Sequence, residues 1–255
     1  MKFRPCIDIH NGCVKQIVGG SLKDEKNVAV DNFVSEKNAD FYAQLYKKHN
    51  LSGGHIIILN PEGSEFYETD LKQAKLALEN YEGGLQLGGG INPDNAKKFL
   101  DMGASHVIVT SYVFKNGVFN EENLDKMLKT VGKDHLVLDL SCRKRDGKYF
   151  IVTDRWQKFT EVELNKKTIH ALSKSCDEFL IHAVDVEGKA SGVETELCQM
   201  MGDLCEIPST YAGGISSLSD VEIIRNTGRG KIDFTVGSAL DLFGGKIPFE
   251  SLINI

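Results

Sequence analysis

The chain has 255 residues, of which 41% are apolar and 26% are charged, and its formal net charge is −6. This composition is ordinary for a globular protein with a sizeable core, and the acidic balance argues against nucleic acid and acidic membranes as partners. No run of about 18 apolar residues is present, so we expect no membrane span. The N-terminus also lacks the basic region and long apolar run of a signal peptide.

The cysteines show neither a C-x-x-C pair nor the spacing of a zinc site. We therefore expect reduced thiols in a cytoplasmic protein. The six cysteines are Cys6, Cys13, Cys142, Cys176, Cys198 and Cys205.

Eight short apolar runs of strand length follow one another along the chain. Near-continuous apolar runs are typical of strands that are covered on both faces, as in parallel sheets. The runs cover about residues 3–9, 55–60, 84–88, 105–110, 135–140, 178–184, 207–212 and 232–237.

Stretches with helix signals lie between these runs. Residues 92–103 have Asn92 in the N-cap position, Pro93 at the first helical position and Gly103 just past the end. The stretches 70–81, 168–175 and 219–228 also have apolar residues at helical spacing. This alternation of strands and helices predicts a parallel sheet with right-handed crossovers.

Eight such units in about 250 residues fit an α/β fold of the (β/α)8 TIM-barrel type, and a doubly wound open sheet is the main rival. Matches between the two halves favour the barrel, because they predict a duplicated half-barrel of four β/α units. We expect one domain over residues 1–255, with halves of about 1–130 and 131–255. The matching pairs, offset by about 124 to 131 residues, are "CIDIHNG" (6–12) with "VLDLSCR" (137–143), "LNPEG" (59–63) with "VDVEG" (184–188), "GGGIN" (88–92) with "AGGIS" (212–216) and "VIVTSYVF" (107–114) with "FTVGSALD" (234–241).

An aspartate ends the first strand of each half, Asp8 in one and Asp139 in the other. Because barrel active sites form at the C-terminal ends of the strands, the two carboxylates are expected to face each other across the mouth. Such a pair can serve as acid and base on one substrate if the environments separate the two pKa values. The alternative, that Asp8 only caps a loop or pairs with Lys15, is weakened by the symmetric position of Asp139.

A glycine loop follows the third strand and another follows the seventh. Glycine permits close approach of a ligand to backbone N–H groups, and a helix start favours an anion. A serine at the end of the neighbouring strand completes each loop, so we expect one phosphate cradle on each side of the barrel and a bis-phosphorylated small-molecule substrate. The candidate phosphate-binding residues are Gly89, Gly90, Ser111, Gly213, Gly214, Gly237 and Ser238.

The segment 142–156 carries Arg143, Arg145 and the only tryptophan, Trp156. It is expected to form a short hairpin around "RDGK". The basic residues could close over a phosphate and Trp156 could stack on a planar base, and a solvated turn with a packed tryptophan is an equally good interpretation. No histidine spacing supports a metal, and neither a Rossmann nor a Walker motif is present, so we expect no metal and no cofactor.

Six segments, spread over essentially the whole chain, resemble the phosphoribosylformimino-5-aminoimidazole carboxamide ribotide isomerases of histidine biosynthesis, in their eukaryotic branch. The resemblance implies an aldose–ketose isomerase of the TIM-barrel fold that performs an Amadori rearrangement without a cofactor or metal. It also implies that Asp8 is the base that removes the C2 proton and Asp139 the acid that protonates the ring oxygen, although the two roles could be exchanged. The segments are "CIDIHNGCVKQIVGG" (6–20), "LQLGGGIN" (85–92), "VLDLSCRKRDGKYFIVTDRWQ" (137–157), "IHAVDVEGKASGVE" (181–194), "YAGGISS" (211–217) and "TVGSALD" (235–241).

Two positions depart from the commoner bacterial pattern of this family. Ala183 replaces a threonine after the sixth strand, and Asn60 replaces an aspartate after the second. Asp185 is a candidate to supply the polar group that the threonine would otherwise provide at the sixth strand.

Two alternatives remain open. The cyclase subunit of imidazole glycerol phosphate synthase shares the barrel, both aspartates and both phosphate sites, but carries a sequence like "DGTKSG" where this chain has "EGKASG". The second alternative is a non-catalytic barrel that binds a phosphorylated ligand, since fold alone does not fix function. In each case we expect a monomer without nucleic acid or membrane partners.

Overall fold

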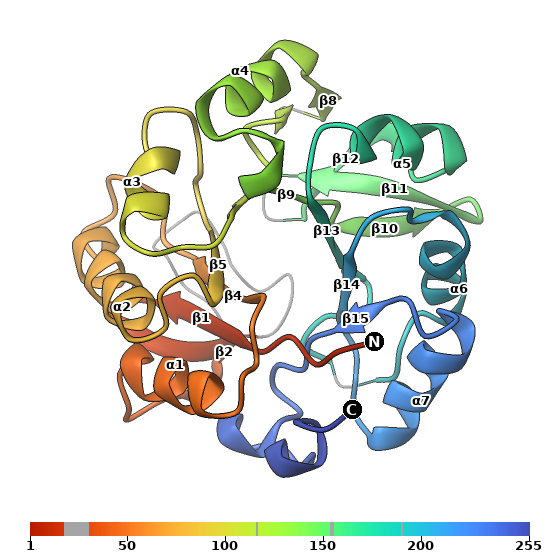
Figure 1. Cartoon of the computed structure of the whole chain (residues 1–255). Helices are drawn as coiled ribbons and strands as arrows, with labels where there is room; N and C mark the ends of the chain where they lie inside the picture. The colour runs from red at the N-terminus through yellow and green to blue at the C-terminus, as the bar shows by residue number, and fades with distance from the viewer. Residues whose placement is uncertain (18–30, 116, 154–155, 190) are drawn as a thin grey trace.

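The computed structural model describes residues 1–17, 31–115, 117–153, 156–189 and 191–255. Eight parallel strands form the centre of the molecule (Figure 1). Their interior positions are almost all buried, as expected for strands covered on both faces. The strands are β1 (Cys6–His10), β4 (Gly54–Ile58), β5 (Leu85–Gly88), β6 (Val107–Val109), β9 (Leu136–Asp139), β13 (Glu178–His182), β14 (Ser209–Ala212) and β15 (Asp233–Phe234).

The parallel strands close into a barrel at the junction between the two ends of the chain. Phe3, just before β1, pairs in parallel with Phe234 of β15. The backbone N–H of Arg4 donates to the carbonyl of Phe234 at 2.8 Å, and the N–H of Phe234 donates to the carbonyl of Lys2 at 3.1 Å. This closure confirms the predicted (β/α)8 barrel and excludes the open sheet.

A buried ion network reinforces the closure. Arg4 donates through Nε to Asp233 at 2.7 Å, and its guanidinium also lies 3.3 Å from a carboxylate oxygen of Glu178. Gln86 and Thr210 donate to the same Glu178 carboxylate. These side chains lie at the amino-terminal end of the strands, the end of a barrel that serves stability.

Helices cover the outside of the barrel (Figure 1). Three of them start at a side-chain cap: Asn120 accepts from the N–H of Asn123, Asn165 accepts from that of Thr168, and Ser217 forms a capping box. The helices are α1 (Ala39–Lys48), α2 (Tyr67–Asn80), α3 (Ala96–Asp101), α4 (Glu121–Val131), α5 (Lys166–Ser173), α6 (Thr195–Leu204) and α7 (Leu218–Thr227). None of the described helices has the length and apolar character needed to cross a membrane.

The helix predicted for residues 92–103 begins later than its sequence signals indicate. Residues 93–95 form turns, and α3 starts at Ala96 with Asn95 in the N-cap position. Asn92 still fixes the entry to the helix, because its side chain accepts from the N–H of Asp94 at 2.8 Å. The predicted segments 70–81, 168–175 and 219–228 correspond to α2, α5 and α7 within three residues at each end.

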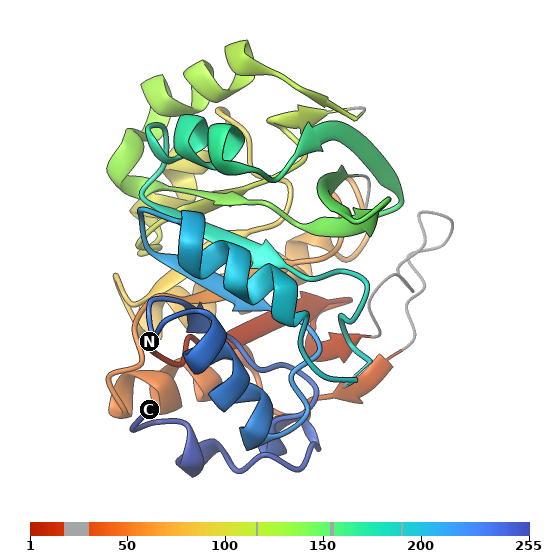
Figure 2. The same cartoon turned by 90° about the vertical axis from the view of Figure 1, so that its right-hand side faces the viewer.

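Further antiparallel strands extend from the carboxyl-terminal end of the barrel, opposite the chain termini (Figure 2). β2 (Cys13–Ile17) and β3 (Asp31–Val34) add antiparallel strands beyond β1. β10 (Cys142–Arg145), β11 (Lys148–Thr153) and β12 (Lys158–Glu163) form a separate antiparallel sheet, and β7 (Phe114–Lys115) pairs with β8 (Val118–Phe119). Asp146 and Gly147 connect β10 to β11 with φ of 52° and 78°, which confirms the hairpin predicted around "RDGK".

Candidate active site

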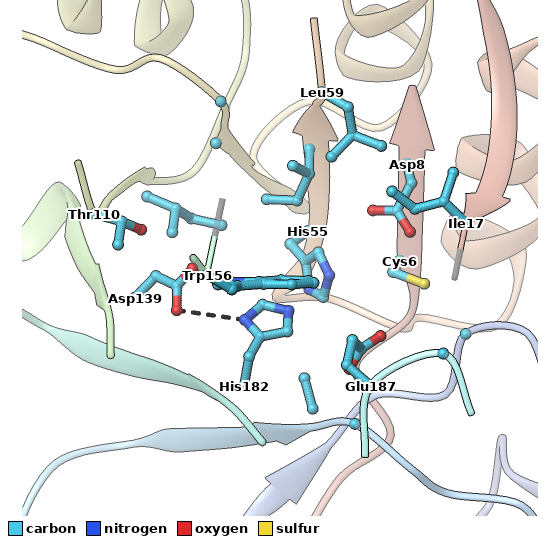
Figure 3. Close-up of a pocket in the computed structure, with 18 of the residues that line it drawn as sticks. Cys6, Asp8, Ile17, His55, Leu59, Thr110, Asp139, Trp156, His182 and Glu187 are labelled. Atoms are coloured by element: carbon cyan, nitrogen blue, oxygen red, sulfur yellow. Dashed lines mark hydrogen bonds and ion pairs between the residues drawn. The ribbon is translucent and has the colours of Figure 1, made fainter. Parts of the chain in front are cut away.

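A cavity of about 540 Å³ opens at the carboxyl-terminal end of the barrel. Both predicted aspartates line it, and Figure 3 shows them on opposite sides, Asp8 on β1 and Asp139 on β9. All seven predicted phosphate-binding residues also line the cavity: Gly89, Gly90, Ser111, Gly213, Gly214, Gly237 and Ser238.

Asp8 is held in an environment that favours its neutral form. Burial raises the pKa of this carboxyl to about 7, and the nearby negative charge of Glu187 adds to the effect. The positive charge of His182 and a hydrogen bond from Gln16 act in the opposite direction. Gln16 Nε2 donates to Asp8 Oδ2 at 2.9 Å from the neighbouring strand β2. The Asp8 carboxyl can therefore both accept and release a proton near neutral pH, which suits a proton acceptor.

Asp139 has the opposite environment. Burial would raise the pKa of this carboxyl, but the charge of His182 and hydrogen bonds from His182, Ser141 and Thr110 outweigh burial and hold the pKa below its ordinary value. Asp139 Oδ1 accepts from the backbone N–H of Ser141 at 2.8 Å and from its hydroxyl at 2.7 Å. The carboxyl groups of Asp8 and Asp139 therefore differ in protonation, although both are buried in one cavity.

His182 and His55 form the floor between the two carboxylates (Figure 3). Nδ1 of His182 lies 3.3 Å from Asp139 Oδ1, and both side chains are 12–13% exposed. Burial opposes the charge on His182, but Asp139, Glu187 and Asp8 together raise its pKa to about 9. Burial and the charge of His182 lower the pKa of His55 to about 3. His182 is therefore a cation at neutral pH and His55 is neutral.

Glu187 is a third carboxyl group of the cavity, carried by the loop after β13. Burial raises its pKa, and the charge of His182 acts against that shift. Its Oε2 atom is buried and has no hydrogen-bond partner among the described residues. Glu187 therefore adds negative charge near Asp8 and contributes to the raised pKa of the Asp8 carboxyl.

The two glycine loops have nearly the same backbone conformation. Gly89 and Gly213 have φ of 106° and 117°, and the following Gly90 and Gly214 have φ of 67° and 74°. A Cβ atom on Gly89 would lie 2.1 Å from the carbonyl oxygen of Ile58, so only glycine fits there. The similarity supports the duplication inferred from the sequence.

The four candidate substrate contacts, three from the basic loop and Asp185 from the loop after β13, separate into two groups. Trp156 lines the cavity, where Nε1 donates to the Ser141 hydroxyl at 3.0 Å and the ring lies 5.8 Å from that of His182. Arg143, Arg145 and Asp185 lie outside the cavity lining. Asp185 accepts from Arg143 Nε at 2.7 Å and from the backbone N–H of Lys144 at 3.1 Å. These contacts attach strand β10 to the loop after β13.

Arg145 has its own partners within the β10–β12 sheet. Its guanidinium lies 4.3 Å from the ring centre of Phe150 and 5.0 Å from that of Phe159, and 3.5 Å from the carboxylate of Glu161. The described contacts of Arg143 and Arg145 thus stabilise the sheet in which Trp156 lies between strands β11 and β12.

Asn60, one of the two departures from the bacterial pattern, fixes the turn between β1 and β2. Its Oδ1 accepts from the N–H of Asn11 at 2.8 Å, and its Nδ2 donates to Asn11 Oδ1 at 3.0 Å. Asp70 of α2 accepts from the N–H of Gly12 in the same turn at 2.6 Å. Ala183, the other departure, is buried and lies outside the cavity lining.

The sequence reasoning missed four polar groups of the cavity: Gln16, His55, His182 and Glu187. His182 is the last residue of β13 and therefore stands at the same edge as the aspartates. Its place near the end of the predicted strand 178–184 was the available signal. Gln16 and Glu187 enter from a hairpin and a loop, whose directions a strand pattern does not give. Within the described ranges, no group of three or more His, Cys, Asp or Glu side chains is arranged to hold a metal ion.

A model of the family described as histidine biosynthesis protein matches residues 2–248. The chain belongs to this family. A chloroplastic isomerase of Medicago truncatula is 52% identical to it over 258 residues, which cover 99% of this chain and 81% of the relative. That relative is named 1-(5-phosphoribosyl)-5-((5-phosphoribosylamino)methylideneamino)imidazole-4-carboxamide isomerase.

Two fungal members of the histidine biosynthesis family carry the same isomerase name. The protein of Yarrowia lipolytica is 45% identical over 262 residues, covering 99% of this chain and 97% of the relative. The protein of Saccharomyces cerevisiae is 42% identical over 257 residues, covering 98% and 95% respectively. The similarity therefore extends over whole chains and includes both halves of the barrel.

Proposed function

We infer that this protein is an aldose–ketose isomerase of histidine biosynthesis, which converts the aminoaldose phosphoribosylformimino-5-aminoimidazole carboxamide ribotide into its ribulosyl isomer. Full-length relatives at 42–52% identity bear the name of this isomerase. The single structural observation that carries the inference is the pair Asp8 and Asp139. They line one cavity from opposite strands, and their pKa values are shifted in opposite directions.

The two carboxyl groups match the two proton transfers that an Amadori rearrangement needs. Ring opening requires a proton at the ring oxygen, and formation of the ketose requires removal of the proton from C2. Asp8, with a pKa of about 7, is poised to accept the C2 proton near neutral pH. We assign the protonation of the ring oxygen to the Asp139 side of the cavity.

The glycine loops are proposed to bind one phosphate each. Gly89, Gly90 and Ser111 lie on one side, and the symmetric loop residues lie on the other. Backbone N–H groups freed by glycine are well suited to phosphate oxygens. Two cradles on either side of an acid–base pair support a substrate that carries a phosphate at each end. The symmetric residues are Gly213, Gly214, Gly237 and Ser238.

Trp156 is the one residue of the basic loop that we propose as a substrate contact. Its ring borders the cavity beside His182 and is available for stacking on a planar base. Because Arg143, Arg145 and Asp185 have partners elsewhere, we propose that they hold the β10–β12 sheet in place.

Incubation of the purified protein with the aminoaldose, without ammonia and without a glutaminase, tests the function. We expect conversion to the ketose with both ring systems intact. A protein that is inactive until ammonia is added would be the cyclase, and one that binds the bis-phosphate without turnover would be a binding barrel. Either outcome contradicts the inference.

We also propose that the chain acts as a monomeric, single-domain enzyme in the cytosol. All six cysteines are free, which is consistent with a reducing compartment. Closure of the barrel between Phe3 and Phe234 supports one folding unit over 1–255. Light scattering of the purified protein tests the monomeric state, and imaging of a fluorescent fusion tests the location in the cytosol.

A further inference from the structure

The hydrogen bonds around Asp139 leave its own carboxyl group without a proton. Its Oδ1 receives three donors: the Ser141 N–H, the Ser141 hydroxyl and Nδ1 of His182. The Ser141 hydroxyl accepts a hydrogen bond from Trp156 Nε1 at 3.0 Å, so its own proton is directed toward Asp139. A carboxylate surrounded by donors is stabilised in its ionised form. Asp139 alone therefore cannot be the proton source of a resting enzyme at neutral pH.

His182 is the group beside Asp139 that does hold a proton. Its ring lies among charged groups from three other strands and one loop, and the charges that act on it are mostly negative. Figure 3 shows its second ring nitrogen directed into the cavity, away from Asp139. The ionisable groups that act on His182 or lie beside it are Asp139 on β9, His55 on β4, Asp8 on β1, and Glu187 in the loop after β13. Cys6 on β1 lines the same cavity.

We propose that His182 stores the proton that Asp139 delivers to the substrate, so that the acid of the reaction is the Asp139–His182 pair. The proposal rests on the isomerase function inferred above. His182 acts through Asp139 and is therefore a positioning and proton-storing residue, whereas Asp139 is the group that meets the sugar.

The proton balance of the isomerisation closes with these groups alone. A proton moves from His182 Nδ1 through Asp139 to the ring oxygen, the bond from C1 to that oxygen breaks, and the nitrogen lone pair forms a C=N bond. Asp8 then removes the C2 proton, and the released electron pair neutralises the iminium as an enamine. Return of the Asp8 proton to C1, with loss of the C2 hydroxyl proton to the Asp139–His182 pair, gives the ketose and restores both groups.

Replacement His182→Gln tests the proposal, because the amide can still donate a hydrogen bond to Asp139 but stores no transferable proton. We expect kcat to fall by about 100-fold or more, and KM to stay within about threefold. In the wild type kcat should decline above about pH 9, where the stored proton is lost. In the variant this alkaline limb should move to below neutral pH, because the Asp139 carboxyl must then hold the proton itself.

His106→Gln is the matched control. His106 also pairs with a carboxylate, since its Nε2 lies 3.2 Å from Asp177, but it lies outside the cavity lining. Its replacement should leave kcat, KM and the pH profile of kcat unchanged. A His182→Gln protein that keeps the wild-type kcat and alkaline limb overturns the proposal while the isomerase function stands.

A spectroscopic measurement on the wild-type protein covers the case in which the variant does not fold. In ¹⁵N-histidine-labelled protein, one of the seven histidines should remain an imidazolium at pH 8, and its pKa should fall in Asp139→Asn. If every histidine signal inside the barrel is neutral at pH 7.5, the proposal is wrong. This readout needs no substrate, so it is independent of whether the wild-type protein makes the ketose.

Discussion

His55 and His182 lie with ring centres 6.3 Å apart in the same cavity, and they have opposite charge states at neutral pH. Burial disfavours the cation in both rings. His182 has the Asp139 carboxylate at 3.3 Å, and this contact reverses the effect of burial. The two histidines thus show how the placing of carboxylates, Asp139 first among them, divides chemically identical side chains into a cation and a neutral group.

Replacement Asp8→Asn should lower turnover by orders of magnitude, because it removes the proposed base and nearly preserves its shape. Initial rates of ketose formation from the aminoaldose measure kcat, and circular dichroism checks that the fold is retained. Asp139→Asn should have an effect of similar size. Near-normal turnover in either variant would show that the acid–base assignment is wrong.

The same Asp8→Asn replacement should stabilise the protein, and more so at high pH. The pKa of Asp8 is about 7 in the folded chain and ordinary in the unfolded chain. Below about pH 4 the carboxyl is protonated in both states, so its burial as a carboxylate costs the wild type no stability there. The wild type loses stability as the pH rises through 7. Between pH 5 and pH 8 the advantage of the variant in urea unfolding should grow by about 2 to 3 kcal/mol. An advantage that shrinks over this range would contradict the shifted pKa.

Gln16→Met should move the lower limb of the pH profile upward. Gln16 donates to the ionised form of Asp8, so loss of this bond leaves the carboxylate less stabilised. We expect the pKa read from kcat/KM to rise by about half a unit to one unit. An unchanged or lowered pKa would show that Gln16 does not control Asp8.

Gly89→Ala should be more damaging than Gly90→Ala. Both positions have positive φ, which costs a residue with a Cβ about 1 to 2 kcal/mol. Gly90 has open space around a new Cβ, whereas at Gly89 the Cβ would lie 2.1 Å from a backbone oxygen. Thermal unfolding should therefore show a further loss of about 2 kcal/mol or more for Gly89→Ala. Equal losses would mean that the loop relaxes freely.

Arg4→Met should destabilise the barrel without impairing the chemistry. Removal of Arg4 leaves Glu178 and Asp233 buried without their cation, a change that typically costs about 3 to 5 kcal/mol. The control is Arg229→Met, which removes a half-exposed pair with Asp203 and should cost less than about 1 kcal/mol. Urea unfolding measures both, and kcat of the folded Arg4→Met protein should stay within about twofold. A small cost for Arg4→Met would mean that the ion network does not hold the barrel closed.

The fold could be predicted from sequence because strand runs and the repeat of the two halves are local patterns. Asp8, Asp139 and the glycine loops follow from the rule that strand ends meet at one edge of a barrel. The charge states of the cavity could not be predicted in the same way. They depend on burial and on contacts such as Gln16 with Asp8 and His182 with Asp139, which join residues from different strands. The late start of α3 had a different cause, since the Asn92 side chain caps a turn before the helix.

A structure of the protein with a bis-phosphorylated substrate or product analogue tests the central claim most directly. We predict that the Asp8 and Asp139 carboxylates flank C1 and C2 of one opened sugar. One phosphate should lie on the Gly89–Gly90 loop and the other on the Gly213–Gly214 loop. A ligand with both phosphates on the same loop, or with its sugar out of reach of either carboxylate, would contradict the account.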